Sequence, residues 1–159
     1  MILQAARRLG AVAILATGAV HLQQYLGQDF QAIPTIGTLF LMNAIGSGII
    51  GLGLLFPVER VVPNRLANAA IALLAAGAVA IAVGALVALF ISESGGLFGF
   101  TESGYRTAVV LAIIAESATI LLLAPVLAST VGRAVGRERQ PSTRSEWSAS
   151  NWRDRSATR

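Results

Sequence analysis

The sequence predicts an all-α integral membrane protein, an antiparallel bundle of four transmembrane helices. Of its 159 residues, 55% are hydrophobic and 13% are charged, a balance that favours a membrane protein over a soluble globular domain. Four separate apolar segments are each long enough, at about 1.5 Å per residue, to cross a hydrocarbon layer about 30 Å thick. The connections between them are short, so helices that follow one another in sequence are expected to be neighbours in space.

The first predicted span covers residues 9–26 and follows the basic pair Arg7 and Arg8. A basic pair before an apolar core is also a feature of signal peptides. We nevertheless expect an uncleaved helix. Its apolar core is longer than that of a signal peptide, and the sequence HLQQY near its end is a poor cleavage region.

The next three spans are predicted over residues 34–56, 66–91 and 107–127. Pro34 opens the second span and Pro57 directly follows its end, and both are positions at helix ends where proline is tolerated. We therefore expect one domain of four transmembrane helices over residues 1–132.

The placement of arginine predicts the orientation, because cytoplasmic loops of membrane proteins carry an excess of basic residues. Arginines occur before the first span, between the second and third, and after the fourth: Arg7, Arg8, Arg60, Arg65 and seven residues beyond position 131. We therefore expect both termini to be cytoplasmic. All twelve basic residues are arginine, which we attribute to a GC-rich bacterial genome, so the expected location is the plasma membrane of a bacterium.

Residues 133–159 are predicted to form a basic, disordered cytoplasmic tail, because serine and arginine dominate their composition. Arginine beside a transmembrane helix favours contact with anionic lipid headgroups, at about 1 kcal/mol per residue near the surface. Tryptophan also prefers the headgroup level. The residues expected to contact lipid or a partner protein are Arg133, Arg137, Arg139, Trp147 and Trp152. We expect no binding of nucleic acid.

Small residues recur at four-residue spacing in the predicted helices, which places them along one helix face. The third span carries Ala72, Ala76, Ala80 and Gly84 in this register, and the second span carries Gly51 in register with Asn43 and Ser47. Small residues let transmembrane helices approach one another closely. These positions are therefore predicted to mediate helix packing.

Glu116 is a lone carboxylate near the middle of the fourth span. An ionisable side chain at bilayer depth costs from roughly 3 to more than 10 kcal/mol, so it normally faces a partner or a wet cavity. The helix rise places Glu116 roughly 14 Å below the outer end of its span, Asn43 at a similar level and His21 roughly 8 Å deep. We therefore expect Glu116, Asn43, His21 and Ser47 to form an intramembrane polar site in the outer half of the bundle.

Two interpretations of this polar site remain open. In the first, the side chains hold the helices together, and interhelical hydrogen bonds of this kind contribute about 0.6 to 2 kcal/mol. In the second, Glu116 and His21 exchange a proton with the outside, as intramembrane carboxylates do in proton-coupled carriers.

Other chemistries find little support in the residues present. The chain has no cysteine, and its single histidine and lone intramembrane acid are too few for a zinc site. Haem could use His21, but a second histidine is missing and Met42 is predicted to lie deeper in the membrane. We expect no cofactor, with haem as an alternative. Neither a catalytic triad in one layer, a phosphate-binding loop nor an HExxH motif is present, so we expect no enzymatic activity.

Residues 18–55 contain HLQQY at the end of the first span and IPTIGTLFLMNAIG at the start of the second. This pattern resembles HLxxY followed by IPxIGxLFLxNAIG in a family of small, uncharacterised bacterial membrane proteins. The resemblance covers about a quarter of the chain and implies the four-helix architecture, but no activity. The chain differs from the small multidrug carriers, whose acidic residue lies in the first helix.

The minimal loops, the faces of small residues and the basic tail favour a non-enzymatic role. We expect an accessory or interaction subunit of a larger membrane complex, or a homo-oligomer, whose partners are lipids and other membrane proteins. The alternatives are a small proton-linked carrier or channel with Glu116 as its protonatable site, and a haem-binding membrane subunit that uses His21.

Overall fold

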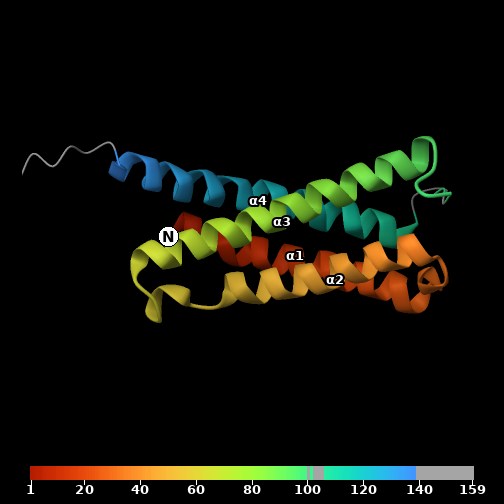
Figure 1. Cartoon of the computed structure of the whole chain (residues 1–159), viewed down its shortest axis with the longest axis horizontal. Helices are drawn as coiled ribbons and strands as arrows, with labels where there is room; N and C mark the ends of the chain where they lie inside the picture. Colours follow the sequence, from red (N-terminus) through yellow and green to blue (C-terminus); the bar gives the residue numbers. More distant parts are fainter. Residues whose placement is uncertain (100, 102–105, 139–159) are drawn as a thin grey trace, which may run out of the picture.

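The computed structural model describes residues 1–99, 101 and 106–138, which fold into four long α-helices (Figure 1). Their bounds are α1 Ile2–Gly27, α2 Pro34–Leu55, α3 Asn64–Ser94 and α4 Thr107–Glu138. Two short 3-10 helices lie in the connections, η1 Phe30–Ala32 before α2 and η2 Val58–Arg60 before α3. All four long helices are long and apolar enough to cross a membrane. The all-helical fold class and the presence of four helices that could each span a membrane are thereby confirmed.

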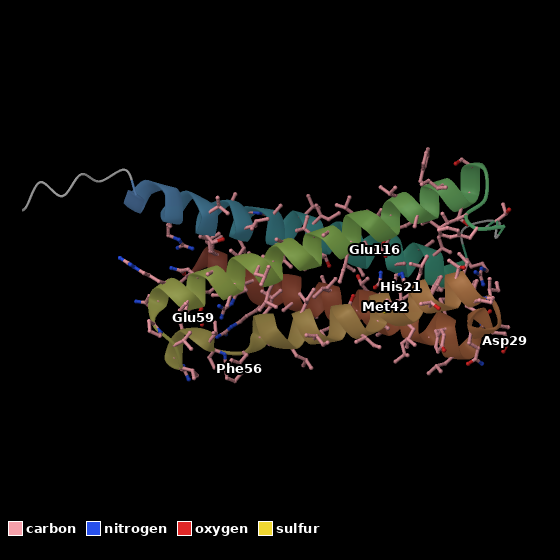
Figure 2. All side chains as sticks on the ribbon, viewed as in Figure 1. His21, Asp29, Met42, Phe56, Glu59 and Glu116 are labelled. Atoms are coloured by element: carbon pink, nitrogen blue, oxygen red, sulfur yellow. The ribbon has the colours of Figure 1, made fainter. Side chains whose placement is uncertain are left out.

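Consecutive helices run in opposite directions (Figure 1). α1 packs extensively against α2 and α4, α3 packs extensively against α4, and the α2–α3 seam is the weakest contact between neighbours. We call the end that carries residues 28–33 and 95–99 the Asp29 end. The opposite end, which carries η2 and the start of α1, is called the Glu59 end (Figure 2).

Two of the helices extend well beyond the apolar segments that predicted them. α1 begins at Ile2 and includes the basic pair, while α4 continues through the predicted start of the tail, so that Arg137 lies within this helix. Hydropathy marks the part of a helix that fits the hydrocarbon layer, whereas backbone hydrogen bonding continues until a breaker intervenes. The predicted contact residues Arg139, Trp147 and Trp152 lie outside the described residues.

The half of the bundle toward the Glu59 end has a close-packed apolar core. All four helices contribute to it through Ala11, Ile14, Leu54, Ile71, Ala75, Ala78, Leu123 and Val126. Glycine permits the closest approaches here, since a Cβ atom at Gly10 would lie 2.5 Å from the side chain of Leu123. A Cβ atom at Gly51 would likewise lie 2.5 Å from the side chain of Leu15. This half is therefore filled by side chains.

The face that α3 buries differs from the predicted stripe of small residues. The buried positions are Ala67, Ile71, Ala75, Ala78, Ala82 and Ser92. Of the predicted packing residues, Ala72 and Ala76 are half-buried and Ala80 and Gly84 are exposed. Alanine is so frequent in this helix that spacing alone defines more than one small-residue face. Contact with α4 decides which face is buried.

Large apolar side chains cover much of the outer surface of the bundle. Leu73 of α3 is 75% exposed and Leu121 of α4 is 74% exposed. Such a surface would be unfavourable in water but suits contact with lipid chains, which are as apolar as leucine itself. The surface thus agrees with the length and hydropathy of the helices.

Candidate functional site

A cavity of about 460 Å³ lies among the helices toward the Asp29 end. It exists because α2 and α3 diverge toward the Asp29 end of the bundle. Ile81 and Leu74 of α3 lie against Gly46 and Gly53 of α2, but beyond Ile81 α3 runs away from α2 (Figure 1). Residues of all four helices line the cavity, and most of them are apolar.

Glu116 projects from α4 into this cavity and is only 2% exposed. Its Oε1 atom lies 3.8 Å from Nε2 of His21 on α1 (Figure 2). Within the described part of the chain, this is the one polar contact that the carboxyl group makes. The two predicted ionisable residues therefore form a pair at the cavity wall.

The second ring nitrogen of His21 fixes how the imidazole presents itself to Glu116. Nδ1 lies 2.9 Å from the backbone carbonyl oxygen of Thr17, one turn earlier in α1. A carbonyl oxygen can only accept a hydrogen bond, so Nδ1 must carry the proton and donate. In the neutral ring, Nε2 is then an acceptor that lies 3.8 Å from the carboxyl group. Either atom of the pair can therefore take up a proton, although at 3.8 Å the two are not hydrogen-bonded to each other.

The remaining predicted polar residues lie on α2. Asn43 lines the cavity, and its Oδ1 atom accepts a hydrogen bond of 3.1 Å from Oγ of Ser47. Ser47 is fully buried below the cavity, where it packs against Gly18 of α1. The structure thus brings Glu116, His21 and Asn43 to one cavity, while Ser47 supports Asn43 from beneath.

An aromatic wall was missed by reasoning from the sequence. The Phe40 ring lines the cavity, lies 5.1 Å from the ring of His21 and stacks on Phe30 at 4.9 Å between centroids. The guanidinium group of Arg106 lies over the Phe30 ring, 5.9 Å from its centroid. Phe40 precedes Asn43 by three residues on the same face of α2, and this spacing was the signal that could have revealed it.

Two further polar residues of α1 lie at the site. Gln24 lines the cavity one turn beyond His21 and is buried. Thr17 is fully buried, and its hydroxyl group has no hydrogen-bond partner among the described residues. The face of α1 that carries His21 is therefore polar over more than one turn.

No side-chain cluster suited to a metal ion occurs in the described ranges, where three or more His, Asp or Glu residues never meet. No protein-family model, curated protein or solved structure matches this chain.

A separate ion pair lies at the opposite end of the bundle. Arg7 of α1, which is buried, donates a hydrogen bond to Oε1 of Glu59 in η2. Partial burial opposes ionisation of Glu59, but backbone and side-chain hydrogen bonds together with the charges of Arg7 and Arg60 hold its pKa below the ordinary value. This pair ties the start of α1 to the connection between α2 and α3.

Proposed function

We propose that this protein is a small proton-linked carrier whose protonatable site is the pair formed by Glu116 and His21. The observation that carries the proposal is a buried carboxyl group facing an imidazole nitrogen across 3.8 Å at the wall of a cavity of about 460 Å³. The cavity gives a ligand or water access to the buried acid, and exchange of protons with a ligand requires such access.

The chemistry of the pair supports proton binding. Nε2 of neutral His21 and an ionised Glu116 would be two acceptors facing each other, which is unfavourable in a site with few other polar groups. One proton, either on the carboxyl group or on the imidazole, turns one of the two acceptors into a donor and removes this repulsion. The site is therefore expected to gain and lose a single proton as a unit.

A carrier agrees better with this arrangement than a channel. Toward the Glu59 end, the cavity gives way to the packed core that includes Ile14, Leu54 and Leu123. A continuous pore would have to pass through these side chains. A carrier instead exposes one binding site to the two sides of a membrane in turn.

We further propose that the Glu59 end faces the cytoplasm, as the excess of basic residues there suggests. Arg7, Arg60, Arg65 and Arg133 all lie toward this end of the bundle. With this orientation, the cavity and its proton-binding pair belong to the outer half of the membrane.

The experiment that tests the proposal follows the protonation state of Glu116 directly. Infrared difference spectra of the full chain in nanodiscs would be recorded across the pH range in which carboxyl groups and imidazoles titrate. We expect a carboxyl signal that changes with pH, disappears in Glu116→Gln and persists in Glu93→Gln, a substitution on α3 outside the cavity. A Glu116 signal that never changes while the protein stays folded would make this residue structural and overturn the proposal.

A second candidate function is that of an interaction subunit in a larger membrane complex. A separate apolar hollow of about 270 Å³ lies between α1 and α2, lined by Leu15, Gly18, Ala19, Leu22, Leu41, Ala44, Ile45 and Gly48. Small residues on a lipid-facing surface allow close approach of another helix.

Purification of the tagged protein from native membranes in mild detergent tests this second candidate. A stoichiometric larger partner would support the interaction subunit. A homo-oligomer without another protein would favour the carrier, and a Soret absorption band would replace both with a haem-binding role for His21.

A further inference from the structure

We propose that the cavity binds a hydrophobic amine in its protonated form, which reaches the site from the lipid phase between α2 and α3. This inference rests on the proton-linked function proposed above and assigns a ligand class to the same site. It is carried by the acceptors in the cavity, by the aromatic wall and by the position of the opening.

The two acceptors of the pair require a ligand that is positively charged and donates hydrogen bonds. Once the pair has lost its proton, Oε1 of Glu116 and Nε2 of His21 are two acceptors 3.8 Å apart at the cavity wall. A group that satisfies both atoms must donate hydrogen bonds, and a group that neutralises the carboxylate must be positive. An ammonium group does both, because it carries a charge and more than one N–H donor.

The surroundings of the pair favour a cation over an anion. Among the described residues that line the cavity, none is Arg or Lys. Phe40 lines the cavity while Phe30 stacks on one face of its ring, and aromatic rings attract cations when water is excluded. The stacked partner of Phe40 already has a guanidinium group, that of Arg106, over its ring.

The rest of the ligand should be apolar. Most of the wall is built from Ala, Ile, Leu, Val and Gly residues. The cavity volume of about 460 Å³ lies in the range of roughly 300 to 1,000 Å³ that is typical of sites for small organic molecules. A strongly hydrated cation would lose its water shell here without replacement. A hydrocarbon body with one ammonium group matches both parts of the wall.

The position of the opening indicates the route of access. Four of the residues that line the cavity are themselves exposed, namely Leu39 and Met42 on α2 and Ala80 and Gly84 on α3. They flank the α2–α3 seam, where Met42 is 65% exposed. In a bilayer this seam would face lipid chains, so a hydrophobic amine dissolved in the membrane can reach Glu116 without crossing the loops.

Proton balance follows from the same geometry. The pair holds one proton before binding, the ammonium ion replaces it, and that proton passes to water, so one proton leaves for each ammonium ion bound. Among the described residues that line the cavity, the ionisable ones are Glu116 from α4 and His21 from α1. The cavity-lining residues of α2 and α3 include Asn43 and Ser92 but no ionisable side chain. Acid should therefore compete with the amine.

Octylamine is a suitable probe, and octanol is its uncharged analogue. Binding of labelled octylamine to the full chain in nanodiscs would be measured by equilibrium dialysis, with proton release followed in weakly buffered solution. We expect saturable binding, one proton released per amine, and affinity that weakens about tenfold for each unit of falling pH while the pair holds its proton. Octanol should partition into the membrane without saturation.

Variants separate the site from general partitioning. Glu116→Gln should weaken octylamine binding by roughly tenfold or more, and His21→Leu should weaken it as well, whereas Glu93→Gln should bind like the natural chain. Circular dichroism checks that each variant is folded. Equal binding by Glu116→Gln and the natural chain, saturable binding of octanol, or no saturable binding of octylamine would each overturn the inference.

The infrared titration keeps the two proposals apart. If Glu116 changes its protonation state with pH but octylamine does not bind saturably, the ligand class is wrong and the proton-linked site stands. If Glu116 does not titrate, both proposals fail together.

Discussion

At the residue scale, glycine decides how closely α1 and α2 approach. A Cβ atom at Gly18 of α1 would lie 2.9 Å from Cβ of Ser47 and 3.2 Å from the carbonyl oxygen of Ala44. Neither of these atoms can move without displacing the backbone of α2. On the facing helix, a Cβ atom at Gly48 would have no heavy atom within 4 Å. Two glycines in the same interface therefore have different roles.

This difference gives a matched pair of substitutions. Gly18→Ala should destabilise the protein by about 1 to 3 kcal/mol, because it overpacks the interface against Ser47. Gly48→Ala should be neutral or stabilising by roughly 0.5 to 1 kcal/mol, because alanine is the better helix former. Thermal unfolding in detergent measures both. Equal losses for the two variants would contradict the assignment of the close contact to Gly18.

At the scale of elements, the pair of Arg7 and Glu59 joins the first turns of α1 to η2. Its effect should depend on pH. The folded-state pKa of Glu59 is held below its ordinary value, so the stabilisation is complete at neutral pH and is lost as the pH falls through the folded-state pKa. The side chain of Glu59 is 36% exposed, so solvent screens the interaction and its contribution should be about 1 kcal/mol or less.

Glu59→Gln tests this pH dependence. The variant should unfold at a lower temperature than the natural chain at neutral pH, and the two should converge in acid, once Glu59 is protonated in both folded and unfolded chains. Arg8→Gln removes a neighbouring arginine that is exposed, and it should leave the pH dependence unchanged. A constant difference between Glu59→Gln and the natural chain at all pH values would show that the ion pair is not responsible.

The helices themselves could be predicted from sequence, but their ends and faces could not. An apolar run of about 20 residues has one favourable state in a membrane, the helix, so hydropathy found all four. The polar turns that extend α1 and α4 carry no such signal. The choice between Ala75 and Ala76 as the buried position of α3 likewise depends on where α4 lies, which no local spacing encodes.

At the scale of the whole molecule, helix rise along each span could give the depth of Glu116, His21 and Asn43, and these residues do line one cavity. The cavity itself could not be predicted. It arises from the lean of α3 away from α2, and this lean depends on packing among all four helices. The aromatic wall depends on η1, because Phe30 belongs to that short helix and stacks on Phe40 of α2.

The same lean predicts where access to the cavity can be blocked. Gly84 is exposed at the α2–α3 seam, lines the cavity and leaves open space for a Cβ atom, so Gly84→Leu should fold normally but fill the opening. We expect octylamine binding to fall by about tenfold or more. Gly132→Leu is the matched control, since Gly132 on α4 is also exposed and unobstructed but does not line the cavity. Unchanged binding in Gly84→Leu would exclude this seam as the route.

The bundle thus has a hollow half and a filled half, and the two should differ in compressibility. Pressure favours states with less void volume. Lateral pressure should therefore move the C-terminal end of α3 toward α2, while the core around Ile14, Leu54 and Leu123 keeps its shape. A bilayer exerts a lateral pressure on its proteins, and the lipid composition sets the size of this pressure. We therefore expect amine affinity to fall in tightly packed bilayers and to rise when the bilayer is stretched. The lean of α3 would make the binding site responsive to membrane tension.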